Sequence, residues 1–176
     1  EQIRCRHCDD ELFTAARSGG YYAGALRASV LALKRQPEVS GRLLELITVV
    51  ASAAPLNTAT LILPVPLHLE RERERGFNQA AALASAIAQK ISLPLNETSL
   101  VRVKHTARHR AEMDARARRE SVEKVFEVAH PRRVRERAIL LVDDVMTTGA
   151  TLSACARVLL AAGATQVFAL TIARAK

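Results

Sequence analysis

The clearest alternation of apolar and polar segments lies near the C-terminal end of the chain. Residues 138–142 form a continuous apolar run, which predicts a buried strand, and residues 143–149 predict a turn. Residues 150–162 have the apolar spacing of a helix that stops at Gly163, and residues 166–172 predict a second strand. A strand, a helix and a strand in this order form a βαβ unit, so the pattern predicts a parallel sheet with helices on its faces.

The first half of the chain predicts three helices and one more strand. Apolar positions recur at helical spacing over residues 22–34 and 40–53. An alanine-rich helix is predicted over residues 80–91, with Asn78 as its N-cap. The apolar run at residues 60–67 is bounded by prolines and is too short for a buried helix, so it predicts a buried strand.

Polar segments connect these elements. Residues 1–20 and the alternating Glu and Arg residues at 70–76 have the composition of loops. Residues 102–119 hold seven Lys or Arg side chains and scarcely any large apolar residue. Such a segment cannot bury itself. A short strand over residues 122–128 and a basic connector over residues 132–137 follow.

The length of the chain indicates the number of domains, and its net charge indicates which partners it favours. The 176 residues allow about one domain, and 49% hydrophobic with 25% charged residues is typical of a folded globular chain. The net charge of +8 favours an anionic partner, namely a phosphorylated small molecule, nucleic acid or a membrane surface. The uncharged stretch over residues 158–173 has 16 residues, fewer than the roughly 18 to 20 that a bilayer span needs, so no span is predicted there.

The chain has three cysteines, Cys5, Cys8 and Cys155. An odd and small number is typical of a reducing compartment rather than a disulfide framework, so we expect a cytoplasmic location. Cys5 and Cys8 have the spacing of half a zinc site, but Zn²⁺ needs four ligands and Cys155 falls in a predicted buried helix. Zinc binding is therefore expected only if further N-terminal ligands are present.

Two adjacent carboxylates, Asp143 and Asp144, follow the most apolar predicted strand, at the edge where open α/β sheets bind ligands. A threonine-rich turn with Gly149 then leads into a helix, whose free N–H groups and positive dipole end suit an anion. Carboxylates repel a phosphate but accept hydrogen bonds from sugar hydroxyls. The arrangement therefore favours a sugar phosphate, with a capped turn carrying two solvated aspartates as the alternative interpretation.

The whole segment, with its strand, acid pair and Thr-Thr-Gly-Ala-Thr turn at residues 147–151, resembles the phosphoribosyl pyrophosphate (PRPP) binding motif of the type I phosphoribosyltransferases. The chain also resembles the ComF family, relatives of bacterial competence proteins that carry such a domain, at residues 22–27, at Lys34 and at residues 63–67, 75–79 and 104–106. The resemblance implies an α/β fold with a central, mostly parallel sheet flanked by helices, and a mobile loop in the basic segment over residues 102–119.

The resemblance also implies a division of the chain and roles for individual residues. Residues 21–176 would form the phosphoribosyltransferase-like domain, after a remnant of a zinc-ribbon-like segment over residues 1–20, which includes the half zinc site. The residues implied in catalysis are Asp143, Asp144 and Lys104. The cations implied in binding pyrophosphate, with Mg²⁺, are Arg71, Arg75 and Arg102. The residues implied in binding the 5-phosphate are Val145, Met146, Thr147, Thr148, Gly149, Ala150 and Thr151.

The implied chemistry is displacement at C1 of the ribose, where pyrophosphate leaves and the nitrogen of an amine or base attacks. A function of a different class stays open. The chain could be a nucleic-acid-binding accessory factor for uptake of single-stranded DNA, with a PRPP-type site that is retained but catalytically silent. The basic charge favours this alternative. An aromatic content of 3% without Trp disfavours it, because sequence-tolerant binding of single strands relies on aromatic stacking.

Overall fold

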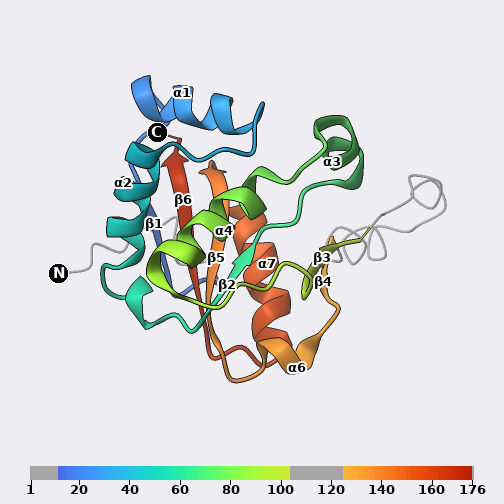
Figure 1. Ribbon diagram of the computed structural model, residues 1–176. Coiled ribbons are helices and arrows are strands. Elements are labelled where there is room, and N and C mark those ends of the chain that lie inside the picture. Colours follow the sequence, from blue (N-terminus) through green and yellow to red (C-terminus); the bar gives the residue numbers. More distant parts are fainter. Residues whose placement is uncertain (1–11, 104–124, 176) are drawn as a thin grey trace.

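The computed structural model describes residues 12–103 and 125–175, and its centre is a four-stranded parallel sheet (Figure 1). From one edge to the other the strands are β1 (Ala15–Ser18), β6 (Gln166–Arg174), β5 (Ala138–Met146) and β2 (Leu61–Pro64). β5 and β6 pair along their whole length, from Ala138 opposite Gln166 to Met146 opposite Arg174. Because the pairings of β1, β5 and β2 are all parallel, the carboxyl ends of these strands share one edge of the sheet.

Helices cover both faces of this sheet. α1 (Gly24–Leu33), α2 (Gly41–Ala51) and α4 (Gln79–Ile91) contribute to one apolar cluster, and α7 (Ala150–Ala161) contributes to a second cluster on the opposite face. None of the helices in the described part of the chain combines the length and the apolar character that crossing a membrane requires.

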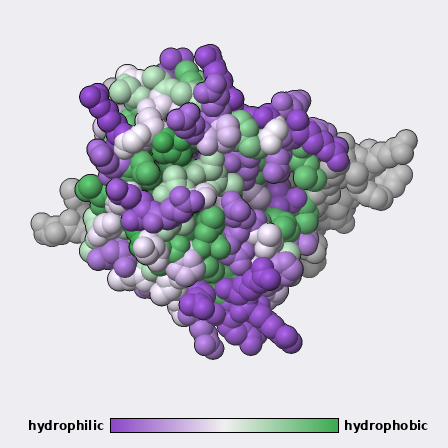
Figure 2. Space-filling model, in the orientation of Figure 1, coloured by the Kyte–Doolittle hydropathy of each residue, from purple (hydrophilic) through white to green (hydrophobic). Residues whose placement is uncertain are grey.

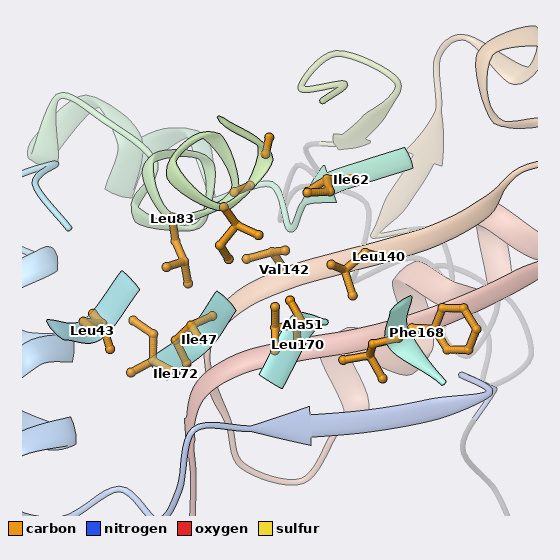
Figure 3. Close-up of a cluster of buried hydrophobic side chains, with 14 of the residues drawn as sticks. Leu43, Ile47, Ala51, Ile62, Leu83, Leu140, Val142, Phe168, Leu170 and Ile172 are labelled. Atoms are coloured by element: carbon orange, nitrogen blue, oxygen red, sulfur yellow. The ribbon is translucent and has the colours of Figure 1, made fainter. Parts of the chain in front are cut away.

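The two clusters are built by alternation along the central strand. Leu140 and Val142 of β5 face the cluster of α2 and α4, where the labelled side chains interdigitate (Figure 3). Ile139 and Leu141 face α7. All four side chains are fully buried. A central parallel strand is covered on both faces, and for this reason its sequence is a continuous apolar run without alternation.

Shorter elements lie between the larger ones. They are η2 (Leu56–Thr58), α3 (Leu69–Arg75), α6 (Pro131–Val134), β3 (Leu100–Arg102) and β4 (Phe126–Val128). β3 and β4 pair antiparallel and form a separate small sheet. Phe126 of β4 packs into the same apolar cluster as α7, so the small sheet is attached to that side of the molecule.

The predicted βαβ unit and the three predicted helices are confirmed, with ends that differ by a few residues. The predicted N-cap is also confirmed, since Asn78 Oδ1 accepts a hydrogen bond from the Ala80 N–H at 2.9 Å. Most of the basic segment over residues 102–119 lies outside the described residues, so its mobility stays a prediction.

The loop predicted at residues 70–76 is wrong, because Leu69–Arg75 form helix α3. Because its residues alternate in charge and none of them is buried, this helix has no hydrophobic periodicity from which it could be predicted. Opposite charges lie three residues apart on it, and its first turn contains Glu70 and Glu72 while its last turn contains Arg73 and Arg75, positions that the helix dipole favours. Gly76 ends it in the left-handed conformation, at φ 80°. The basic connector likewise begins with a helical turn, α6.

Two other predictions need correction at the sheet. Ala15–Ser18 form edge strand β1 rather than a loop, because β6 supplies a parallel partner for this short segment. The turn predicted over residues 143–149 is shorter, since β5 continues through the acid pair to Met146. Polar residues suggested that the strand had ended, but β6 runs alongside it to Arg174 and completes its hydrogen bonds.

Candidate functional site

The turn between β5 and α7 surrounds a small hollow at the carboxyl edge of the sheet. Gly149 is the N-cap of α7, with φ 80°, a left-handed conformation that glycine adopts without strain. The first N–H groups of a helix have no acceptor within the helix, so this end of α7 suits an anion. The Thr148 hydroxyl accepts a hydrogen bond from one of them, the Ala150 N–H, at 3.4 Å.

The hollow has a volume of about 20 Å³, which holds a group of roughly the size of a water molecule. It therefore admits about one oxygen atom of a larger ligand, whose other atoms would lie outside it. The lining residues are Asp143, Val145, Met146, Thr147, Gly149, Ala150, Thr151 and Leu152. Of the residues predicted to bind phosphate, Thr148 is the one that does not line the hollow.

The two carboxylates of the acid pair have different surroundings. Successive residues of a strand leave the backbone on opposite faces, so Asp143 and Asp144 point away from β5 in different directions. Asp143 lines the hollow next to α7. Asp144 contacts residues at the ends of α1 and α4 and is 7% exposed. A ligand in the hollow therefore meets Asp143 first.

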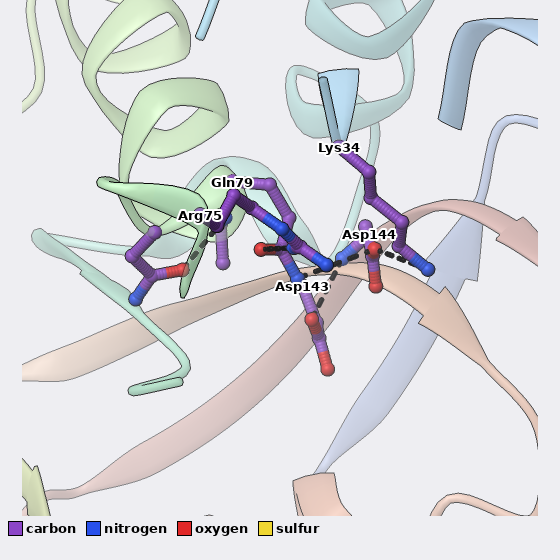
Figure 4. A network of polar contacts seen from close by, with 7 residues as sticks. Lys34, Arg75, Gln79, Asp143 and Asp144 are labelled. Carbon is purple, nitrogen blue, oxygen red and sulfur yellow. Dashed lines mark hydrogen bonds and ion pairs between the residues drawn. The ribbon is translucent and has the colours of Figure 1, made fainter. Parts of the chain in front are cut away.

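Asp144 is held by residues from two distant segments (Figure 4). Its Oδ2 accepts a hydrogen bond from Gln79 Nε2 at 3.3 Å and pairs with Lys34 Nζ at 3.1 Å. Gln79 is the first residue of α4, and Lys34 directly follows α1. Because an unpaired charge in a protein interior is costly, these two contacts are what allow a carboxylate to be buried here.

Arg75, the last residue of α3, belongs to the same network. Its Nη1 donates a hydrogen bond to Gln79 Oε1, and its side chain is half-buried (Figure 4). Arg71 is exposed one helical turn earlier, on the same face of α3. Two of the three cations predicted to bind pyrophosphate thus lie on one helix face, and Arg75 is linked through Gln79 to the acid pair.

The pKa of Asp143 is raised from 3.8 to about 7. Burial is the largest cause, followed by the negative charge of Asp144. The Asp144 N–H, which donates to Asp143 Oδ1 at 2.8 Å, and the charge of Lys34 act in the opposite direction. Near neutral pH, both protonation states of this carboxyl group are therefore populated at the hollow.

The remaining predicted residues either have another contact or lie outside the described part of the chain. Arg102 lies over the ring of Phe126, with Cζ 5.4 Å from the ring centroid. Lys104, Cys5 and Cys8 lie outside the described residues, so their roles stay predictions. Cys155 is buried in α7 facing the sheet, as predicted, and burial raises the pKa of its thiol well above the ordinary value.

Sequence analysis assigned no role to Lys34 or Gln79. Gln79 ends the segment at residues 75–79, which resembles the ComF family, so its position carried a signal. Lys34 was also among the positions that resemble the ComF family, but its contact was not predictable, because a lysine at the end of a helix is ordinarily a solvated side chain. Its partner Asp144 lies far along the chain and becomes its neighbour only in the folded protein.

A parallel sheet whose central strand ends in an acid pair and a glycine-capped anion turn has the architecture of a phosphoribosyltransferase domain. The chain belongs to the phosphoribosyl transferase domain family, which it matches over residues 78–176.

Two curated relatives illustrate the similarity. The chain is 31% identical over 121 residues to Competence protein F of Haemophilus influenzae, which covers 68% of this chain and 52% of that protein. It is 33% identical over 93 residues to DNA utilization protein YhgH of Escherichia coli O157:H7, covering 53% of this chain and 40% of the relative. The chain thus spans about half the length, or less, of these relatives, and the predicted resemblance to competence proteins is confirmed.

Solved structures share the fold. The B. subtilis glutamine PRPP amidotransferase complexed with ADP and GMP matches 81% of this chain and 30% of its own, with a TM-score of 0.55 and 16% identity. A structure described as the allosteric regulatory enzyme of purine biosynthesis matches with a TM-score of 0.53 and 18% identity, over 81% of this chain and 25% of its own. The predicted fold class is confirmed.

The raised pKa of Asp143 predicts how stability depends on pH. Between pH 3.8 and about 7 the folded state binds more protons at this residue than the unfolded state does. As pH rises through this window, wild type should therefore lose stability relative to Asp143→Asn, whose side chain cannot ionise. Urea unfolding of both proteins at several pH values measures this. A difference in unfolding free energy that stays constant from pH 4 to 7 would contradict the raised pKa.

Removing the cation beside Asp144 should destabilise the fold. Lys34→Met leaves the buried carboxylate with Gln79 as its remaining partner, and we expect a loss of about 1 to 3 kcal/mol in unfolding free energy. Lys90→Met, at an exposed position on α4, is the matched control and should cost a few tenths of a kcal/mol at most. Combining Lys34→Met with Asp144→Asn should recover part of the loss. Equal stability of the two lysine variants would argue against a structural ion pair.

Proposed function

We propose that this domain binds PRPP and transfers its phosphoribosyl group to the nitrogen of an amine or base. The observation that supports this most is the hollow at the N-terminus of α7, where anion-binding amides and the Asp143 carboxylate lie side by side. An anion site alone would not need an acid in its wall. A sugar phosphate uses both, because its phosphate and its hydroxyls need opposite kinds of partner.

Different groups of residues would bind the two ends of PRPP. The N–H groups of α7, with the hydroxyls of Thr147 and Thr151, would bind the 5-phosphate. Asp143 would accept hydrogen bonds from the ribose hydroxyls. Arg75, with Arg71 on the same face of α3, would bind the pyrophosphate at C1, where guanidinium groups match phosphate oxygens in charge and geometry.

Mg²⁺ fits this arrangement as a partner of the ligand. Within residues 12–103 and 125–175, no group of three or more His, Cys, Asp or Glu side chains could hold a metal ion. Mg²⁺ commonly binds through one or two carboxylates together with substrate phosphates, and Asp143 is a carboxylate in the right place. When bound, Mg²⁺ would neutralise charge on the pyrophosphate oxygens and make this group easier to displace.

The reaction would be a displacement at C1 of the ribose. The bond from C1 to the pyrophosphate oxygen breaks, and the oxygen takes the electron pair. The lone pair of the acceptor nitrogen forms the new C1–N bond, and this nitrogen then loses a proton. Positive charge develops on the ribose ring between these events, so the protein acts by holding both ends of the ligand and by stabilising the departing pyrophosphate with arginine.

Titration calorimetry with PRPP and Mg²⁺ tests the proposal. Wild type should bind, and Asp143→Asn should bind at least about tenfold more weakly because an amide is a poorer acceptor for hydroxyls than a carboxylate. Gly149→Val should abolish binding, since valine is strained at φ 80° and Gly149 lines the hollow.

Gly41→Val is the matched control, because a side chain there meets open space at the start of α2. It should bind PRPP like wild type, and circular dichroism should show that all the variants are folded. Affinity that is the same for wild type, Asp143→Asn and Gly149→Val would place the ligand elsewhere. Pyrophosphate release in the presence of a panel of amines and bases then distinguishes a transferase from a binding module.

A second candidate function is contact with a nucleic acid strand. Arg132, Arg133, Arg135 and Arg137 are all exposed, and we call them the basic edge. Figure 2 shows hydrophilic side chains gathered over α6, where the basic edge begins. Asp143 lies five residues beyond Ala138 on β5, so roughly 17 Å of strand separates the start of β5, next to the basic edge, from the acid pair. This charge is therefore not part of the PRPP site.

Binding of a fluorescent single-stranded DNA, measured by anisotropy over a range of salt, tests this second candidate. The double variant Arg132→Glu and Arg133→Glu should weaken binding roughly tenfold and flatten the dependence of affinity on salt, because fewer phosphates are neutralised. Arg27→Glu with Arg42→Glu is the matched control, on exposed positions of α1 and α2. Equal effects of both pairs would mean that net charge, rather than the basic edge, attracts the strand.

A further inference from the structure

Gln79 has a buried side-chain amide, and both its nitrogen and its oxygen are hydrogen-bonded. It is 5% exposed at the start of α4. Its Nε2 donates to Asp144 Oδ2 at 3.3 Å, and its Oε1 accepts from Arg75 Nη1 (Figure 4). The amide can adopt one orientation only, because a flipped group would turn its oxygen toward the carboxylate and its NH₂ toward the guanidinium.

The backbone next to Gln79 is anchored by the side chain of Asn78. Gly76 and Asn78 lie between Arg75 and the first turn of α4. The Asn78 side chain donates to the Val65 carbonyl at 3.0 Å and accepts from the Ala80 N–H. The start of α4 is thereby attached to the segment that follows β2. Gln79 thus approaches Asp144 from an anchored position.

We propose that Gln79 is a positioning residue that couples Arg75 to Asp144, so that the groups for the two ends of the ligand are set in one arrangement. This inference rests on the proposed PRPP site. Arg75 carries five N–H donors, of which Gln79 orients one edge and leaves the others for pyrophosphate oxygens. Without that contact the guanidinium would have to be ordered during binding, which costs side-chain entropy.

Lys34 and Gln79 contribute differently to Asp144. Lys34 supplies the opposite charge, and its side chain is 34% exposed. Gln79 supplies a neutral hydrogen bond and is the only contact in the described network that continues to α3. Gln79→Met therefore keeps the length of the side chain and the ion pair of Asp144, and removes the link to Arg75.

A double-mutant cycle with two ligands tests the coupling. Affinities for PRPP with Mg²⁺ and for ribose 5-phosphate, which lacks the pyrophosphate, are measured by calorimetry for wild type, Arg75→Met, Gln79→Met and the double variant. Each single variant should bind PRPP five- to tenfold more weakly. The double variant should be no weaker than Arg75→Met within about twofold, because residues that act as one unit are not additive. Ribose 5-phosphate affinity should change less than about twofold throughout.

Other outcomes overturn the inference and separate it from the proposed function. Additive losses for PRPP would mean that Gln79 and Arg75 act independently. An equal loss of ribose 5-phosphate affinity in Gln79→Met would mean that Gln79 only shapes the acid pair. In both cases wild type still binds PRPP, and the proposed function stands. Failure of wild type to bind PRPP removes both proposals.

Two further variants show whether a loss of affinity arises from misfolding rather than from the missing contact. Gln79→Asn keeps a polar amide at the start of α4 but is too short to contact both partners, so it should reproduce the loss seen with Gln79→Met. Gln89→Met, at an exposed position on the same helix, should bind both ligands like wild type. Wild-type affinity for PRPP in Gln79→Asn would contradict the coupling.

Discussion

The buried carboxylate of Asp144 is the group on which the arrangement of the site depends. It lies within the central strand and needs compensating partners, which Lys34 after α1 and Gln79 at the start of α4 provide. Satisfying this one charge therefore positions two helices relative to the sheet. Gln79 also accepts a hydrogen bond from Arg75, so the group that compensates the buried charge also orients a side chain of α3.

Asp143, next to Asp144 on β5, faces the hollow rather than the helices that hold Asp144. Asp143 leaves β5 on the side of α7 and lines the hollow, where burial and the nearby charge of Asp144 raise its pKa to about 7. The proposed ligand would donate hydrogen bonds from its hydroxyls to this wall and place a phosphate at the glycine-capped end of α7. The acid pair thus combines a residue facing the ligand with a residue facing the scaffold, and Lys34 acts on both through its charge.

Much of the fold could be predicted from local patterns. The βαβ unit, the three longer helices and the Asn78 cap follow from periodicity and capping chemistry and are confirmed. Helix α3 could not be found by hydrophobicity, because it buries none of its residues and depends on the charges in its end turns and on Gly76. Strand β1 could not be found either, since four residues with little apolar pattern become a strand only where β6 is available for pairing.

The same contrast applies to the site. The acid pair and the Thr-Thr-Gly turn are contiguous in the chain, so their chemistry was visible in the amino-acid order, and the match to the phosphoribosyl transferase domain family agrees with it. Which of the two acids faces the hollow, and which is paired with Lys34 and Gln79, was settled by folding. The reason is physical: a buried charge is stabilised by whichever groups the packed helices bring within a few ångströms, and those groups come from segments far apart along the chain.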